Sequence, residues 1–158
     1  MTRYVTVLPL EPLAVGDGFS VSSWPLHVTI VPTFETELSP QAVGAAIDFA
    51  TVGQAPITAV VGEDAMFGSF ATVRVALVTP SPPLDTLHRA SLAGVAVLGA
   101  VFDDPQFIGD GYRPHVTATR RRRSNPGDIL RLSQIALVDM KPSGEASERR
   151  VVWAKTLG

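Results

Sequence analysis

The chain has 158 residues, a length that suits one domain, and 46% of them are hydrophobic, which is enough to form a core. The formal net charge of −2 excludes a protein that attracts long nucleic acids through a strong overall positive field. The absence of cysteine excludes disulfides, thiolate metal sites and cysteine nucleophiles. The longest mostly apolar run, 92–102, is too short to span a bilayer, so we expect a soluble, cytoplasmic protein without a membrane partner.

Regular elements are predicted along the whole length of the chain. Strands are predicted where Val, Ile and Thr are frequent, and helices where a Ser-Pro pair, as at Ser39 and Ser81, precedes apolar residues at helical spacing. In chain order we predict a strand over 4–10, a loop over 11–23, a strand over 26–34, a helix over 39–53, strands over 56–63 and 71–79 with a long connection between them, a helix over 81–99, a loop over 102–111, and strands over 113–121, 129–140 and 149–156. This order predicts a single α+β domain over residues 1–158 with largely antiparallel sheets.

One tripeptide, His-Val-Thr, occurs twice, at 27–29 and at 115–117, and each copy has a proline one or two residues before it. The chain has three histidines, and two of them lie in these copies, one in each half of the sequence. Such self-similarity predicts two related lobes that each supply one histidine and one hydroxyl. Because alternate residues of a strand share a face, the histidine and threonine of each copy should project together, with the valine behind them.

The paired motifs resemble the 2H phosphoesterase superfamily, which includes the LigT-like bacterial RNA 2′,3′-cyclic phosphodiesterases, also called 2′-5′ RNA ligases. The family pattern is His, any residue, Ser or Thr, then a hydrophobic residue. Residues 27–30 match it fully, whereas the second copy ends on the small Ala118. The resemblance implies a bilobal fold in which two pseudo-symmetric lobes of largely antiparallel sheet, with flanking helices, surround a central cleft.

Two histidines across a cleft can supply both proton transfers of phosphodiester cleavage without a metal or another cofactor. Imidazole titrates near neutral pH, so one ring can take a proton from the attacking water or hydroxyl while the other protonates the departing oxygen. Threonine hydroxyls can hydrogen-bond the nonbridging oxygens. The resemblance assigns the first task to His27 and His115 and the second to Thr29 and Thr117, and leaves open which histidine is the base. Neither histidine has a ligand at metal-binding spacing, so we expect no metal.

The basic run 120–123 follows the second motif and has two interpretations. It is either a solvated strand end or a phosphate contact. If the strand continues to 121, strand parity sends Arg121 to the same side as His115 and Thr117, which makes Arg121 a candidate substrate-binding residue.

Aromatic residues near the motifs also have two interpretations. Tyr112 and Trp24 lie just before the motifs and are candidates for stacking on a base, with core packing or a structural hydrogen bond as the alternative. Phe67 has the same two interpretations. His88 lies outside the motifs on a predicted helix and is interpreted as a surface or packing residue.

The leading functional hypothesis is a metal-independent phosphodiesterase, monomeric and without an obligatory protein partner, that acts on a 2′,3′-cyclic phosphate or a 2′-5′ linkage in RNA or an oligonucleotide. One alternative is cleavage of a cyclic di- or oligonucleotide defence signal, which the resemblance to phage members of the superfamily implies. The alternative from another class is a noncatalytic RNA-binding module. The paired histidines argue against that module, because binding alone does not need two proton-transfer groups.

Overall fold

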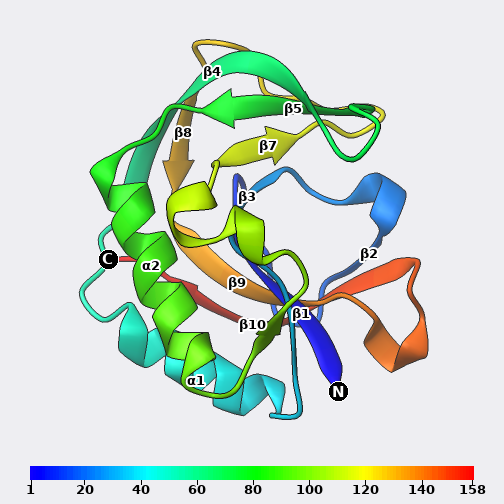
Figure 1. The fold of residues 1–158 in the computed structure, drawn as a ribbon, viewed down its shortest axis with the longest axis vertical. Helices are drawn as coiled ribbons and strands as arrows, with labels where there is room; N and C mark the ends of the chain where they lie inside the picture. Colours follow the sequence, from blue (N-terminus) through cyan, green and yellow to red (C-terminus); the bar gives the residue numbers. More distant parts are fainter.

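A strongly curled antiparallel sheet with two helices makes up the computed structural model, which describes residues 1–158 (Figure 1). The strands are β1 (Thr2–Pro9), β2 (Gly18–Ser20), β3 (His27–Thr36), β4 (Ile57–Phe67), β5 (Val73–Val78), β6 (Val101–Phe102), β7 (His115–Thr117), β8 (Ile129–Leu132), β9 (Gln134–Asp139) and β10 (Glu148–Thr156). The helices are α1 (Pro40–Ala50) and α2 (Pro82–Ala96). Short 3-10 turns are η1 (Val21–Ser23), η2 (Pro105–Phe107), η3 (Gly109–Gly111) and η4 (Pro142–Gly144).

The order of strands in the sheet is β2-β10-β9-β1-β3-β7-β5-β4-β8, with β6 added to the far end of β3. Every pair is antiparallel, so the predicted α+β class with a largely antiparallel sheet is confirmed. The two strands that carry the His-Val-Thr motifs, β3 and β7, are neighbours at the middle of this order. The division into two pseudo-symmetric lobes stays a prediction.

Helices α1 and α2 lie beside each other on one side of the sheet (Figure 1), and small residues allow them to pack closely. A Cβ added to Gly94 of α2 would lie 3.0 Å from the Cβ of Ala50 in α1. A Cβ added to Gly44 of α1 would collide with the indole of Trp153 in β10. Neither helix is long and apolar enough to cross a membrane.

The single strand predicted over 129–140 is wrong, because the chain forms two strands there with different partners. β8 pairs with β4 and alternates exposed and buried residues, as a strand at the edge of a sheet does. β9 lies between β1 and β10, and its first five residues are all buried. The change of burial pattern at Ser133 marks the boundary between the two strands.

The predicted loop over 11–23 is wrong in part, because it contains the short strand β2, which pairs with β10. Among the strand boundaries that differ from the prediction, two lie near the motifs or the connection between β4 and β5. β4 continues to Phe67, so the connection to β5 is shorter than expected. β7 ends at Thr117 rather than 121, because a turn follows in which the Thr119 N–H donates to the Arg122 carbonyl. The strand that carries the second motif is therefore only three residues long.

Candidate active site

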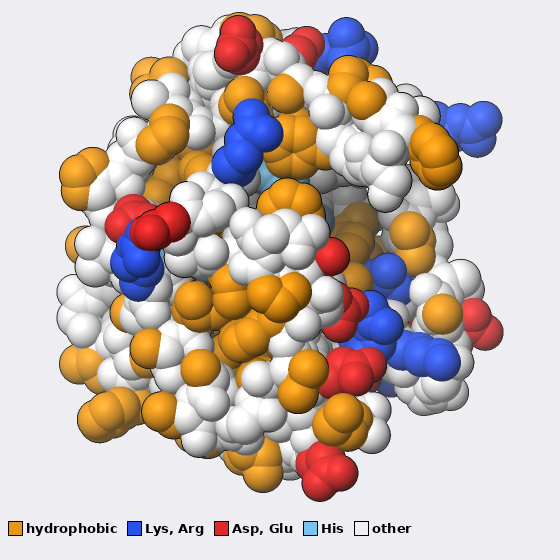
Figure 2. Space-filling view, viewed as in Figure 1, with side chains coloured by type: hydrophobic (Ala, Val, Ile, Leu, Met, Phe, Trp, Pro, Cys, Tyr) orange, Lys and Arg blue, Asp and Glu red, His pale blue; other side chains and the backbone are white.

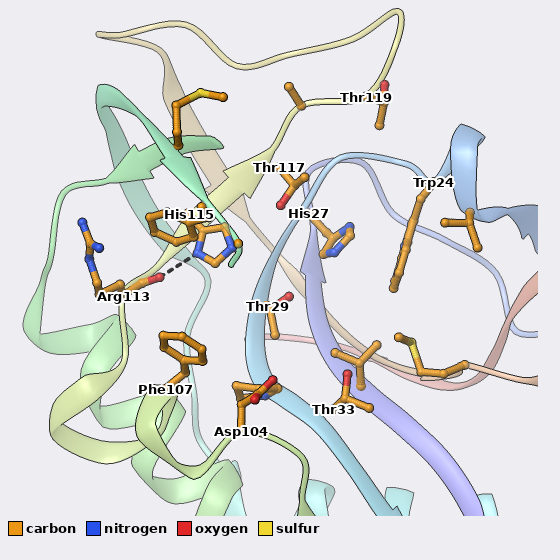
Figure 3. Close-up of a pocket in the computed structure, with 18 of the residues that line it drawn as sticks. Trp24, His27, Thr29, Thr33, Asp104, Phe107, Arg113, His115, Thr117 and Thr119 are labelled. Atoms are coloured by element: carbon orange, nitrogen blue, oxygen red, sulfur yellow. Dashed lines mark hydrogen bonds between the residues drawn. The ribbon is translucent and has the colours of Figure 1, made fainter. Parts of the chain in front are cut away.

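The two His-Val-Thr motifs meet as antiparallel neighbours. Val28 of β3 pairs with Val116 of β7, and their side chains are buried in the core at 0% and 1% exposure. Continuing this register by one residue in each direction sets the histidine of each motif opposite the threonine of the other. Because alternate residues share a face, all four polar side chains leave the sheet on the face opposite the valines, into one cavity (Figure 3).

Each motif histidine is held by the backbone carbonyl two residues before it. His27 Nδ1 lies 2.8 Å from the Pro25 oxygen, and His115 Nδ1 lies 2.7 Å from the Arg113 oxygen (Figure 3 shows the second bond). A carbonyl oxygen can only accept, so we assign the proton of each neutral ring to Nδ1. Nε2 of each ring is then left with a free lone pair.

Aromatic side chains pack against both histidine rings. The Trp24 and His27 ring centroids are 4.5 Å apart at an interplanar angle of 31°, and the Phe67 and His115 centroids are 4.7 Å apart at 66°. The Arg113 guanidinium lies over the aromatic ring of this second pair, 4.8 Å from the Phe67 centroid. Each imidazole is therefore held in a fixed plane and is partly covered by an aromatic ring.

Burial makes both histidines weaker bases than usual. It lowers the pKa of His27 from 6.5 to about 4, against the raising effect of the Pro25 hydrogen bond and with a further lowering from nearby His115. Burial also lowers the pKa of His115, opposed by the Arg113 carbonyl and assisted by the Arg113 charge. In the free protein at neutral pH both rings are therefore uncharged and able to accept a proton at Nε2.

The cavity has a volume of about 1080 Å³. Figure 2 shows histidine atoms at the bottom of a hollow on this face of the molecule. The wall includes aromatic residues from several segments, and its charged residues are Asp104, Arg113 and Arg120. No group of three or more His, Asp or Glu side chains is placed to hold a metal ion.

Seven of the eight residues named from the sequence line this cavity: Trp24, His27, Thr29, Phe67, Tyr112, His115 and Thr117. Arg121 does not, and the parity argument for it is wrong, because β7 ends four residues earlier and the chain turns. Arg120 lines the cavity in its place.

Tyr112 lines the cavity, but its polar group and one ring face are already occupied. Its hydroxyl donates to the Thr29 carbonyl at 2.7 Å, and its ring stacks on His88 with centroids 3.9 Å apart. This arrangement is the structural hydrogen bond that the sequence left as an alternative. His88 itself is fully buried, so of its two interpretations packing is correct and a surface position is wrong.

Three residues that line the cavity were given no substrate-binding role from the sequence: Asp104, which was considered only as a metal ligand, Phe107 and Arg113. Arg113 contributes its backbone carbonyl, which orients the histidine two residues later as Pro25 does in the first motif, and this role does not depend on the side chain. Asp104 and Phe107 had no signal in the sequence, because they lie in a stretch without periodicity whose path depends on contacts with α2.

The fold is similar to that of several solved structures. A crystal structure of a phosphoesterase is 16% identical in sequence, with a TM-score of 0.64 over 99% of this chain and 98% of the other. TT0787 of Thermus thermophilus is 18% identical, with a TM-score of 0.64 over 98% and 97% of the two chains. E. coli LigT in complex with NADP⁺ is 15% identical, with a TM-score of 0.61 over 99% and 97%.

At the level of sequence, no curated protein gives a significant match. The model of the 2′-5′ RNA ligase superfamily matches residues 11–141, which include both motifs. The chain therefore belongs to the 2′-5′ RNA ligase superfamily, the 2H phosphoesterases.

Proposed function

We propose that the protein is a metal-independent phosphodiesterase that cleaves a 2′,3′-cyclic phosphate or a 2′-5′ linkage of RNA or an oligonucleotide. The observation that carries the proposal is the pairing of the two motifs, which directs two histidines and two threonine hydroxyls into one cavity. Both histidines use Nδ1 for a backbone carbonyl and keep Nε2 for the cavity. A pair of such groups suits a reaction with one proton to remove and one to donate.

In hydrolysis, Nε2 of one histidine takes a proton from water as the water oxygen bonds to phosphorus. The bond from phosphorus to the departing ribose oxygen breaks, and that oxygen takes a proton from Nε2 of the other histidine, which must enter the reaction protonated. The Thr29 and Thr117 hydroxyls donate to the nonbridging oxygens, where negative charge grows in the transition state. The two histidines exchange protonation states in one turnover, and exchange with solvent restores them.

A nucleotide substrate is supported by the dimensions and lining of the cavity and by a relative. About 1080 Å³ is at the upper end of ordinary small-molecule sites and accommodates a nucleotide or a dinucleotide. E. coli LigT has been crystallised with NADP⁺ and with 3′-AMP, both of which carry a ribose phosphate. Phe107 is half exposed and lines the cavity, which leaves a ring face free for a base.

The test is a substrate panel: a nucleoside 2′,3′-cyclic phosphate, an RNA with a cyclic phosphate end, a 2′-5′ linked oligoadenylate and a cyclic dinucleotide. We expect turnover of one of the first three, and a loss of about 10²-fold or more in kcat for His27→Ala or His115→Ala. Thr29→Ala and Thr117→Ala should lose less, because water can replace part of a hydroxyl contact.

Several outcomes would contradict the proposal. Full activity in either histidine variant would remove the acid-base assignment. Activity lost in EDTA and restored by zinc or magnesium would replace it with a metal mechanism. Turnover confined to the cyclic dinucleotide would favour a signal-cleaving enzyme, and RNA binding without turnover of any substrate would favour a binding module.

A further inference from the structure

The third histidine, His88, is a buried polar residue whose two nitrogens both have partners. It lies on α2 at 0% exposure. The Gly109 N–H donates to its Nε2 at 2.9 Å, so Nε2 carries no proton. Nδ1 therefore carries the proton and donates to the Ile30 carbonyl at 2.6 Å. A buried imidazole is stable when both of its nitrogens are satisfied in this way, and burial lowers the pKa of His88, which keeps the ring neutral.

The Ile30 carbonyl belongs to an irregular position in β3, directly after the first motif. The register between β1 and β3 steps from Val7 opposite Thr29 to Thr6 opposite Val31. Ile30 is therefore an extra residue without a partner in β1, which is a β-bulge. A bulge breaks the ladder of backbone hydrogen bonds and changes the direction of nearby side chains, and here it adjoins Thr29.

Tyr112 forms a hydrogen bond with the neighbouring carbonyl of β3, that of Thr29. Its hydroxyl donates to the Thr29 oxygen at 2.7 Å, and its ring is stacked on His88 at an interplanar angle of 6°. Burial raises the pKa of the Tyr112 phenol, so the hydroxyl stays a donor. Two stacked side chains thus bind two consecutive carbonyls of the bulge, one from α2 and one from the segment that leads into β7.

The same pair joins the bulge to the second motif. Tyr112 is three residues before His115, and Gly109, which His88 also binds, is in the turn before Tyr112. A short chain of contacts therefore joins Thr29 to His115 through the pair. The Thr29 carbonyl accepts a hydrogen bond from the Tyr112 hydroxyl, and the backbone then runs from Tyr112 to His115, whose Nδ1 is held by the Arg113 carbonyl.

We propose that His88 and Tyr112 are positioning residues, a stacked pair that holds the β3 bulge and so fixes Thr29 and His115 relative to each other at the phosphate. This inference rests on the proposed phosphodiesterase function. The pair does not need to contact substrate through its polar groups, since these are all bonded to backbone. Small errors in the geometry of reacting groups are costly, so loss of the pair should be visible in turnover.

The experiment compares Tyr112→Phe with Thr51→Val. Tyr112→Phe keeps the stacked ring and deletes one hydrogen bond to the Thr29 carbonyl. Thr51→Val deletes a comparable buried bond, from the Thr51 hydroxyl to the Ile47 carbonyl at 2.7 Å on α1, outside the cavity. We expect both variants to lower the melting temperature by similar amounts. Only Tyr112→Phe should lower kcat at 25 °C, by about 10-fold, with KM changed by less than about threefold.

Two substitutions of His88 complete the test. His88→Asn can place its amide N–H near the position of Nδ1 and keep the bond to the Ile30 carbonyl, whereas His88→Leu keeps the volume and deletes both bonds. We expect kcat to fall less in His88→Asn than in His88→Leu. If His88→Leu does not fold, the proposal is still tested by comparing kcat of His88→Asn and Tyr112→Phe with kcat of Thr51→Val. A kcat equal to that of the wild type in Tyr112→Phe would overturn the proposal.

If the proposed phosphodiesterase function is wrong, the wild-type protein turns over no substrate of the panel, which is a different result from those above. The positioning role is then measured through the ring resonances of His27 and His115 in NMR spectra of the free protein. The proposal expects Tyr112→Phe to shift the His115 resonances and Thr51→Val to leave them in place. Unchanged His115 resonances in Tyr112→Phe would overturn it whether or not the protein is an enzyme.

Discussion

At the scale of single residues, the site depends on one local arrangement used twice. In each motif the chain bends so that the carbonyl of residue i−2 meets Nδ1 of the histidine, at 2.8 Å for His27 and 2.7 Å for His115. This bond favours the protonated ring, but burial opposes it and has the larger effect in both cases. The result is two neutral imidazoles whose available atom is Nε2.

These pKa shifts predict the pH dependence of kcat/KM, which reports the free enzyme. The base must be unprotonated, so activity falls as the pH drops through the lower pKa of the pair, about 4 for His27. The acid must be protonated, so activity falls as the pH rises through the higher pKa, which lies below 6.5 because burial lowers the pKa of His115 as well. We expect a bell-shaped profile with its maximum on the acid side of pH 6.5.

The measurement is kcat/KM on the best substrate of the panel from about pH 3 to about pH 9, a range that spans both histidine pKa values. In kcat the maximum should move to higher pH, because a bound phosphate anion favours the protonated ring. A kcat/KM that keeps increasing above the ordinary histidine pKa of about 6.5 would contradict the two-histidine assignment.

At the scale of elements, the site is assembled by one very short strand and one loop. β7 pairs with β3 on one side and with β5 on the other, which holds the second motif in place although the strand is only three residues long. The loop between β6 and β7 contains the turns η2 and η3, whose close packing depends on Gly111. A Cβ at this glycine would collide with the Gln106 carbonyl oxygen, so no side chain fits there.

This contact predicts the effect of Gly111→Ala. The obstructing atom is backbone, so the loop must move, and we expect a loss of about 1 to 3 kcal/mol in the free energy of unfolding, together with a lower kcat as Tyr112 moves. Urea denaturation measures the first effect and the substrate panel the second. Gly62→Ala is the matched control, because its Cβ would lie 3.5 Å from the nearest atom, an ordinary contact. Equal stability of the two variants would contradict the prediction.

Local patterns in the sequence were sufficient to predict a strand at each motif and the starts of both helices, but not the end of the second motif strand. At Ser39 the side chain accepts from the Ala42 N–H, as expected of a helix N-cap. The meeting of the two motifs at one cleft was expected, but the pairing of Val28 with Val116 was not, because register between strands so distant in the chain depends on the whole core. The roles of His88 and Gly109 were not predictable, since their contacts join segments that share no sequence pattern.

At the scale of the whole molecule, charge is distributed unevenly in a protein with a net charge of −2. In the basic run after β7, Arg122 and Arg123 have carboxylate partners, Glu11 at 3.7 Å and Asp64 at 2.6 Å. Arg120 and Arg121 form no ion pair, and Arg120 is the one that lines the cavity. The run therefore offers a substrate in the cavity one arginine without an ion pair, which limits the number of phosphates that the run can neutralise.

The last prediction follows from this local charge. If Arg120 contacts one phosphate beside the cleaved one, kcat/KM on an RNA with a cyclic phosphate end should fall with salt with a log-log slope of about −0.7 to −1.4, the value for one or two phosphates of a single strand. Arg120→Ala should lower kcat/KM and reduce this slope by about 0.7. Arg121→Ala is the matched control, with the same charge change outside the cavity, and should leave the slope nearly unchanged. Equal effects of the two substitutions would show that the run acts through its overall charge and would remove Arg120 from the site.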